Sequence, residues 1–300
     1  QEGTVQEAQN NVNLYQVHRR VNEMYFSLLL LDEQIRLNSD IKNLLLSSEN
    51  KLAAMVKSGT AATSDLDNVR AERLGAEQQN ASLKAQRQML QRMLSVFCGI
   101  EVSKLRKPEA VEATASANNR PELRLFDSQL KLSEVQERAL DARLRPTLGL
   151  FAQGYYGYPG LNMFEDMISR KWRLNGIVGV RLSWNVGALY TRKNDKARLR
   201  VQRELIENAR DVFLFNNNME QIQQTDNISR FRTMMQGDDE VIALRTNVRK
   251  AAESKLVHGI IDVNSLLREI NNENAAKVQQ AIHEIDMLKE MYNLKYTNNE

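Results

Sequence analysis

The sequence is poor in proline, glycine and aromatic residues. Only 4 prolines and 13 glycines occur in 300 residues, so turns are few and the regular elements between them must be long. Asn, Gln, Glu, Lys, Arg, Leu and Ala dominate instead, a composition that favours helix. Aromatic residues make up only 6% of the chain, and a third of them fall between Phe151 and Trp172. That segment is therefore physically different from the rest.

An excess of charge of one sign is also missing. The chain has 41 basic and 38 acidic residues, a net charge of +3, which argues against the concentrated basic face typical of nucleic-acid binding. The single cysteine, Cys98, has no partner for a disulfide, and we interpret it as a small packed residue. His18, His258 and His283 lie far apart with no partner at metal-ligand spacing, so neither a metal nor a cofactor is expected.

Long apolar runs and catalytic motifs are absent as well. No run of about 18 apolar residues occurs, so no transmembrane helix is predicted. No GxGxxG, Walker A, GxSxG or HExxH motif is present, and the acid pair Asp238-Asp239 has no His or Cys near it in sequence. We interpret that pair as a solvated kink and predict no enzymatic activity. The chain opens Gln1-Glu2-Gly3 and enters a helical pattern at once, which favours a processed or trimmed start.

Long amphipathic helices are predicted at both ends of the chain. Apolar residues recur at steps of about four or seven through 5–57, and a second helix follows a turn at Gly59, with Thr63 or Ser64 as its cap. Steps of seven in that helix give a coiled-coil seam, made of Val69, Ala76, Leu83, Leu90 and Phe97. A third long helix over 188–257, weakest at Gly237, leads to a turn at Gly259. A seam at 3-4 spacing then runs to the C-terminus through Val278, Ala281, Ile285, Leu288 and Tyr292.

The middle segment 147–187 changes period from 3.6 to 2. Alternation over 147–158 and 177–187 is typical of strands with one apolar and one polar face, and 9–11 tilted residues per strand would span a bilayer. Residues 159–175 are the expected loop. The alternative is a soluble β-hairpin packed on the helices. The candidate membrane-facing residues are Leu148, Leu150, Tyr156, Tyr158, Val178, Val180, Leu182, Trp184 and Val186, and the candidate interfacial aromatic residues are Tyr156, Tyr158, Trp172 and Trp184.

The fold class predicted is mainly α, with very long antiparallel coiled-coil-like helices and one short two-strand transmembrane β segment. We expect five segments along the chain: a first helical hairpin at 1–100, a linker at 101–118, a helix at 119–146, the strand pair at 147–187 and a second hairpin at 188–300. The two hairpins resemble each other. Gly59 and Gly259 lie 200 residues apart, as do Leu66 and Leu266, so an internal repeat is indicated.

These motifs together resemble the TolC family of outer-membrane efflux proteins over essentially the whole chain. The resemblance rests on the order and spacing of several short motifs and not on any one of them. Those motifs are the two turns at 59–66 and 259–266, the helix start Asn119-Arg120-Pro121-Glu122-Leu123, the strand entry Leu144-Arg145-Pro146-Thr147-Leu148 and the strand exit at 179–187.

The resemblance implies an α-barrel channel in the outer membrane and periplasm of a Gram-negative bacterium. It implies a homotrimer that works as a passive export duct in a tripartite efflux or type I secretion system, with a periplasmic adaptor protein and an inner-membrane pump as partners. Family subunits give four strands to a shared barrel, whereas this sequence has two. The first helix and strand pair of the family pattern have no counterpart before Gln1, so we expect a longer native protein.

The two turns resemble the periplasmic tips of the family, where the adaptor docks. The candidate docking residues are Gly59, Asp65, Gly259, Asp262, Ser265 and Arg268. Members with an acidic constriction carry acids where this chain has Ser265 and Arg268, so only Asp262 is left to substitute. Each of these residues is equally explained as a cap of a hairpin turn. The alternative function is a periplasmic adaptor or coiled-coil scaffold protein.

Overall fold

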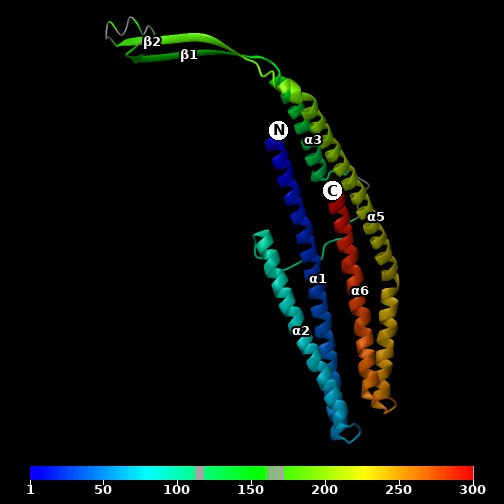
Figure 1. The fold of residues 1–300 in the computed structure, drawn as a ribbon. Helices are drawn as coiled ribbons and strands as arrows, with labels where there is room; N and C mark the ends of the chain where they lie inside the picture. Colours follow the sequence, from blue (N-terminus) through cyan, green and yellow to red (C-terminus); the bar gives the residue numbers. More distant parts are fainter. Residues whose placement is uncertain (112–117, 160, 162–163, 165–167, 169–171, 300) are drawn as a thin grey trace. The chain divides into compact units, whose positions relative to one another are not determined.

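The computed structural model describes residues 1–300 except 112–117, 160, 162–163, 165–167, 169–171 and 300. The described elements, in chain order, are α1 (Glu2–Lys57), α2 (Thr63–Cys98), α3 (Pro121–Arg143), β1 (Thr147–Gly157), β2 (Arg173–Ser183), α5 (Ala188–Val257) and α6 (Val263–Asn298) (Figure 1). The predicted fold class, long helices with one antiparallel strand pair, is confirmed. The expected loop at 159–175 and linker at 101–118 lie partly outside the described residues.

The chain divides into two compact units. Unit 1 comprises residues 1–9 and 122–212, and unit 2 comprises residues 10–121 and 213–300. Both α1 and α5 contribute to both units. The two units group residues that pack together and are not continuous along the sequence. They do not test the five segments expected from the sequence, which remain a prediction.

Unit 2 is built from two long hairpins, α1 with α2 and α5 with α6. With 56 residues in α1 and 70 in α5, these helices are roughly 80 and 100 Å long. Gly237 does not interrupt α5, because a single exposed glycine lowers helix propensity by only about 1 kcal/mol. The scarcity of glycine and proline therefore predicted the long helices correctly.

Two apolar clusters hold unit 2 together. One lies near the turns and takes Leu52 from α1, Val69 from α2, Ala252 from α5 and Ile270 from α6. The other joins α1 to α6 further from the turns, through Phe26, Leu29, Ile285, Leu288 and Met291. The predicted seam of α6 is thus confirmed at Ile285 and Leu288, which are both buried.

The end of α2 differs from its predicted packing. Val69 and Leu83 are buried, but Phe97 is 43% exposed and Leu94 is buried in its place. Cys98, predicted to be packed, is exposed. The reason is that α2 ends at Cys98 and Gly99 turns the chain away with φ 66°, so its last residues border a pocket of about 680 Å³.

The acid pair at 238–239 is not a solvated kink. Asp238 accepts a hydrogen bond from Nδ1 of His283 at 2.8 Å, and Asp239 accepts one from Gln280 at 2.6 Å. Both acids lie within the uninterrupted helix α5. Since His283 is 45 residues away on α6, the prediction from local sequence missed it.

Unit 1 contains α3, the strand pair and the first part of α5. Asp141 of α3 binds Arg192 and Lys196 of α5, and Glu137 binds Arg203. The antiparallel strands pair from Thr147 opposite Ser183 to Gly157 opposite Arg173. The second strand therefore begins and ends four residues before its predicted limits of 177 and 187.

The error in the second strand has a local cause. Residues 173–176 alternate as the core of the strand does, and they pair with 154–157. After Ser183 the indole Nε1 of Trp184 donates to the carbonyl of Leu144 at 3.0 Å, and the amide of Val186 donates to the carbonyl of Trp184 at 3.2 Å. These bonds turn the chain into α5, so residues 184–187 do not extend the strand.

Candidate functional site

The two hairpin turns, tip 1 (residues 58–62) and tip 2 (residues 258–262), share one geometry. Gly59 and Gly259 have φ of 74° and 69°, the left-handed region that favours glycine. In tip 1 the amide of Gly59 donates to Val56 at 3.0 Å and that of Thr60 to Met55 at 2.9 Å. The same pair of bonds recurs 200 residues later, so each tip is a Schellman motif that closes its helix.

The helix cap after tip 1 differs from prediction. The N-cap of α2 is Ala62, not Thr63 or Ser64, because the helix already begins at Thr63. Asp65, three residues into the helix, accepts a hydrogen bond from the Ala62 amide at 3.3 Å. In tip 2 the N-cap is Asp262, whose carboxylate accepts from the Ser265 amide at 2.9 Å. The two tips thus carry their carboxylates at different positions, at the third residue of the helix after tip 1 and at the N-cap after tip 2.

Asp262 is an acidic residue of the tips whose pKa is lowered by its surroundings. Hydrogen bonds from Ser265 lower the pKa of Asp262, with a smaller contribution from the charge of Arg268. Both Asp262 and Arg268 are exposed, while Ser265 is half-buried. An ionised carboxylate at the positive end of a helix also interacts favourably with its dipole.

The tips are held level with each other in unit 2. Glu72, ten residues after the cap Ala62, accepts a hydrogen bond at 2.9 Å from Asn271, nine residues after the cap Asp262. A pocket of about 300 Å³ lies above the tips between α1 and α5, with Lys51, Lys250 and Glu253 among its lining residues. All six residues predicted at the tips therefore belong to one end of unit 2.

The internal repeat extends into the contacts between helices. Asn80 of α2 donates to Ser39 of α1 at 3.1 Å, and Gln280 donates to Asp239, 200 residues further along. Glu49 binds Arg73 at 2.6 Å, and at the equivalent position Arg249 binds Glu273. The charges are inverted, but the contact is the same.

Both buried carboxylates of these pairs are held ionised. The hydrogen bond from Arg73 lowers the pKa of Glu49 against the opposing effect of burial. Burial acts to raise the pKa of Glu273, but hydrogen bonds from Lys277 and Arg249 outweigh it, and the pKa is lowered. Sequence reasoning missed this pair of sites, although the 200-residue offset of opposite charges was visible.

The strand pair in unit 1 has one wholly apolar face. The register places Leu148 opposite Leu182, Leu150 opposite Val180 and Ala152 opposite Val178. Tyr156 and Leu174 continue the same face, and Leu150 and Val178 are each 83% exposed. Six of the nine candidate membrane-facing residues therefore share one face, namely Leu148, Leu150, Tyr156, Val178, Val180 and Leu182. The other three, Tyr158, Trp184 and Val186, lie beyond the strand ends.

The opposite face of the strand pair is mixed. Gln153, Asn175 and Arg181 lie on it together with Phe151 and Ile177. The Phe151 ring covers Gly179, since a Cβ built there would come within 2.8 Å of two ring atoms. The guanidinium of Arg181 lies 5.5 Å from the centroid of the same ring. The two faces therefore differ in polarity, although Phe151 and Tyr155 both lie on the mixed one.

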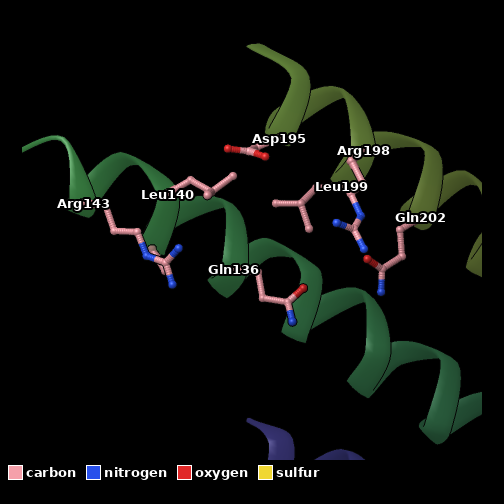
Figure 2. A pocket seen from close by; sticks show the side chains of 8 residues that line it. Gln136, Leu140, Arg143, Asp195, Arg198, Leu199 and Gln202 are labelled. Carbon is pink, nitrogen blue, oxygen red and sulfur yellow. The ribbon is translucent and has the colours of Figure 1, made fainter. Parts of the chain in front are cut away.

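A further pocket of about 360 Å³ lies in unit 1 between α3 and α5. Figure 2 shows Leu140 of α3 and Leu199 of α5 pointing toward each other, with Gln136, Arg143 and Gln202 around them. Sequence reasoning missed this pocket. Helical spacing places its residues on one face of each helix, but nothing in the sequence pairs α3 with this part of α5.

Other kinds of site find no support in the part of the chain that the structure describes. No group of three or more His, Cys, Asp or Glu side chains is arranged to hold a metal ion there. Among the same residues, no helix combines the length and apolarity needed to cross a bilayer.

The fold is one that solved structures of other proteins share. The chain has the TolC-like fold of outer-membrane channel proteins, as the sequence resemblance led us to expect. It is similar to the outer-membrane channel OprN with a TM-score of 0.76 and 14% identity, over 98% of this chain and 68% of that one.

Two further solved structures show the same likeness. The CmeC outer-membrane channel of Campylobacter jejuni matches with a TM-score of 0.77 and 11% identity, over 98% of this chain and 64% of CmeC. VceC, an outer-membrane protein of Vibrio cholerae, matches with a TM-score of 0.74 and 11% identity, over 98% and 71%. A scan of protein-family models gave no match, and neither did a search of curated protein sequences.

Proposed function

We propose that this chain is part of one subunit of an outer-membrane channel, the passive export duct of a tripartite efflux or type I secretion system. The observation that carries the proposal is the exposed apolar face of the strand pair. All ten residues on that face, five from each strand, are apolar, tyrosine or glycine. A monomeric soluble protein rarely leaves such a face in water. The chain is similar to outer-membrane channels, and the lipid of an outer membrane would cover this face.

In this proposal the apolar face contacts lipid and the mixed face lines the pore. Strands of 11 residues are long enough to cross the hydrocarbon core when tilted. Tyr156 and Trp172, whose ring centroids are 5.8 Å apart, would lie at one membrane interface. Trp184 and Val186, at the other end of the sheet, would lie at the opposite interface. Tyr158 would extend the aromatic group that Tyr156 and Trp172 form.

We further propose a homotrimer, which the resemblance to the TolC family implies. A two-stranded sheet has two unpaired edges, which hydrocarbon does not tolerate, so strands of other subunits, or further strands of the same native protein, must cover them. The helices of unit 2 would then extend into the periplasm of a Gram-negative bacterium. No residue in this proposal performs bond chemistry, and the energy for export comes from an inner-membrane pump.

The tips of unit 2 are the proposed docking site for a periplasmic adaptor protein. Gly59 and Gly259 fix the shape of the turns, while Asp65, Asp262, Ser265 and Arg268 give them polar groups. Since Arg268 stands beside Ser265, the carboxylate of Asp262 is partly balanced. We therefore propose a constriction with weak selectivity for cations.

The test is a pair of arginine substitutions on the two faces of one sheet. Val178→Arg puts a charge on the apolar face, which at the bilayer midplane destabilises a barrel by about 2–4 kcal/mol. Gln153→Arg puts the same charge on the mixed face at nearly the same height. In the full-length protein we expect Val178→Arg to abolish insertion and single-channel conductance in planar bilayers, and Gln153→Arg to keep insertion and alter conductance.

The same experiment distinguishes the proposed channel from the alternative function. An adaptor or coiled-coil scaffold would stay soluble without detergent and give no conductance in its unsubstituted form. Equal behaviour of the two arginine variants would likewise contradict the proposal, because it would mean that the faces do not meet different surroundings.

A further inference from the structure

An excess of basic residues flanks the strand pair in sequence. Residues 138–146, before β1, and residues 184–200, after β2, together contain eight basic and two acidic residues. Since the whole chain has a net charge of only +3, the rest of it is net negative. We call these two segments the basic flank. Its basic residues are Arg138, Arg143, Arg145, Arg192, Lys193, Lys196, Arg198 and Arg200, and its acidic residues are Asp141 and Asp195.

Most cations of the basic flank have no partner of opposite charge. Arg192 and Lys196 contact Asp141, and Lys196 also lies 3.7 Å from Glu137. The other six basic residues are all exposed, and none of them forms an ion pair with any residue that the structure describes. These six side chains are therefore able to bind an anion from outside the chain.

Two of the unpaired guanidinium groups line the pocket of about 360 Å³ between α3 and α5. Arg143 is the last residue of α3, and Arg198 belongs to α5. In the view of Figure 2, the apolar side chains of Leu140 and Leu199 lie between the two arginines. The pocket thus combines two cations with an apolar surface, and a ligand that fits both parts is itself an amphiphile with an anionic group.

The charge of the pocket favours a ligand with one negative charge. Asp195 is the only acidic residue among those that line it, so the two arginines leave a net charge of +1. Asp195 is half-buried and forms no ion pair with the described residues. A phosphodiester carries one negative charge and is compact enough to accept hydrogen bonds from two guanidinium forks.

The pocket is close in the chain to residues that would meet lipid. Arg143 precedes the start of β1 by four residues, and Arg198 follows the start of α5 by ten residues, roughly 15 Å of helix. Between them, the first turn of α5 exposes Leu189 and Tyr190, which are 49% and 87% exposed. Long arginine side chains and tyrosine are suited to the boundary between lipid and water, because each has an apolar body and a polar end.

We propose that this pocket binds the phosphodiester group of an anionic phospholipid in the leaflet of the outer membrane that faces the periplasm. The inference rests on the proposed function and deepens it, because it names a lipid that the channel subunit holds beside its strands. Arg143 and Arg198 bind the phosphate oxygens, while Leu140 and Leu199 contact the apolar part of the lipid. The other unpaired cations of the basic flank attract the anionic surface of the leaflet.

The test measures lipid binding by the full-length protein in detergent, using native mass spectrometry to count bound lipids. Phosphatidylglycerol and phosphatidylethanolamine with identical acyl chains are the two probes. We expect the unsubstituted protein to retain phosphatidylglycerol in preference. A basic residue near an anionic surface changes affinity by about fivefold, so Arg143→Gln with Arg198→Gln should weaken phosphatidylglycerol binding by about 25-fold.

A matched control removes two cations elsewhere on the same helix. Arg232→Gln with Arg245→Gln changes the net charge by the same amount, and both arginines are exposed in unit 2. This control should bind phosphatidylglycerol as the unsubstituted protein does. Equal temperatures of thermal unfolding for the two double variants would show that a loss of binding is not a loss of fold.

A further arm distinguishes a lipid from a soluble anion. Inorganic phosphate and glycerol 3-phosphate lack acyl chains, so a tenfold excess of either should leave phosphatidylglycerol bound. The proposal is overturned if either anion displaces the lipid, if both lipids bind equally to the unsubstituted protein, or if the control pair weakens binding as much as the pocket pair.

This outcome is separable from that of the proposed function. Selective lipid binding by a protein that gives no conductance would leave the pocket standing and remove the duct. Conductance without any preference for phosphatidylglycerol would retain the duct and remove the lipid site.

Discussion

The same glycine-to-alanine substitution can be tested in two backbone conformations of this protein, at a left-handed tip glycine and at a glycine within a helix. Gly259 has φ of 69°, and a Cβ added there would meet no atom within 4 Å. The effect of Gly259→Ala is therefore conformational and not steric. Holding an alanine in the left-handed region destabilises by about 1–2 kcal/mol, so the free energy of unfolding should fall by about that amount.

The control is Gly75→Ala. Gly75 lies within α2, is exposed, and also has no atom within 4 Å of an added Cβ. In a helix, alanine is favoured over glycine by about 0.5–1 kcal/mol, so this variant should be more stable than the unsubstituted chain. The two variants should thus differ by about 1.5–3 kcal/mol, with opposite signs.

The assay is urea unfolding followed by far-ultraviolet circular dichroism, with the transition midpoints compared at equal slope. Gly59→Ala should repeat the loss seen for Gly259→Ala, since its φ is 74°. Gly259→Asn should lose less, because asparagine tolerates the left-handed region. The reasoning is refuted if Gly259→Ala unfolds at the same urea concentration as the unsubstituted chain while Gly75→Ala is stabilised.

Two further predictions concern charged groups. The lowered pKa of Asp262 means that its stabilising effect is present above 3.8, its ordinary value, and is lost as the pH falls through the folded-state pKa; Asp262→Asn should reduce stability at neutral pH and flatten its decline in acid, as measured by thermal unfolding between pH 2 and 7, and an unchanged acid slope would contradict this. Glu49→Arg places a third cation beside Arg70 and Arg73 and should destabilise strongly, while adding Arg73→Glu should recover most of the loss; a double-mutant cycle in urea measures the recovery, and simple addition of the two effects would count against a specific pair.

Much of the fold follows from patterns that a single sequence displays. Long helices follow from heptad spacing and from the absence of proline, because an uninterrupted apolar stripe can be buried only by another long helix. The strand pair follows from alternation, and its apolar face was identified at Leu148, Leu150, Val178, Val180 and Leu182. Gly59 and Gly259 were recognised because only glycine enters a left-handed turn without strain.

What could not be predicted depends on partners far away in sequence. Asp238 was interpreted as solvated because its partner, His283, is on another helix. Cys98 was expected to be packed because it follows a heptad seam, but it is the last residue of α2 and borders a pocket that Tyr15 of α1 and Tyr296 of α6 also line. The limits of β2 were misplaced because the alternating residues 173–176 were assigned to the loop and because alternation continues through 184–187, beyond the paired region. Only pairing with β1 decides where the strand begins and ends.

The internal repeat shows what the long hairpins require. Between the two copies the tip turns keep the same hydrogen bonds, and the contacts between paired helices fall at the same positions. The residues that make these contacts are not kept, since Glu49 with Arg73 becomes Arg249 with Glu273. A single charged residue at any one of these positions would be buried without a partner, so both members of a pair must differ together. The register of each hairpin is therefore the property that both copies share, and levelled tips are its direct consequence.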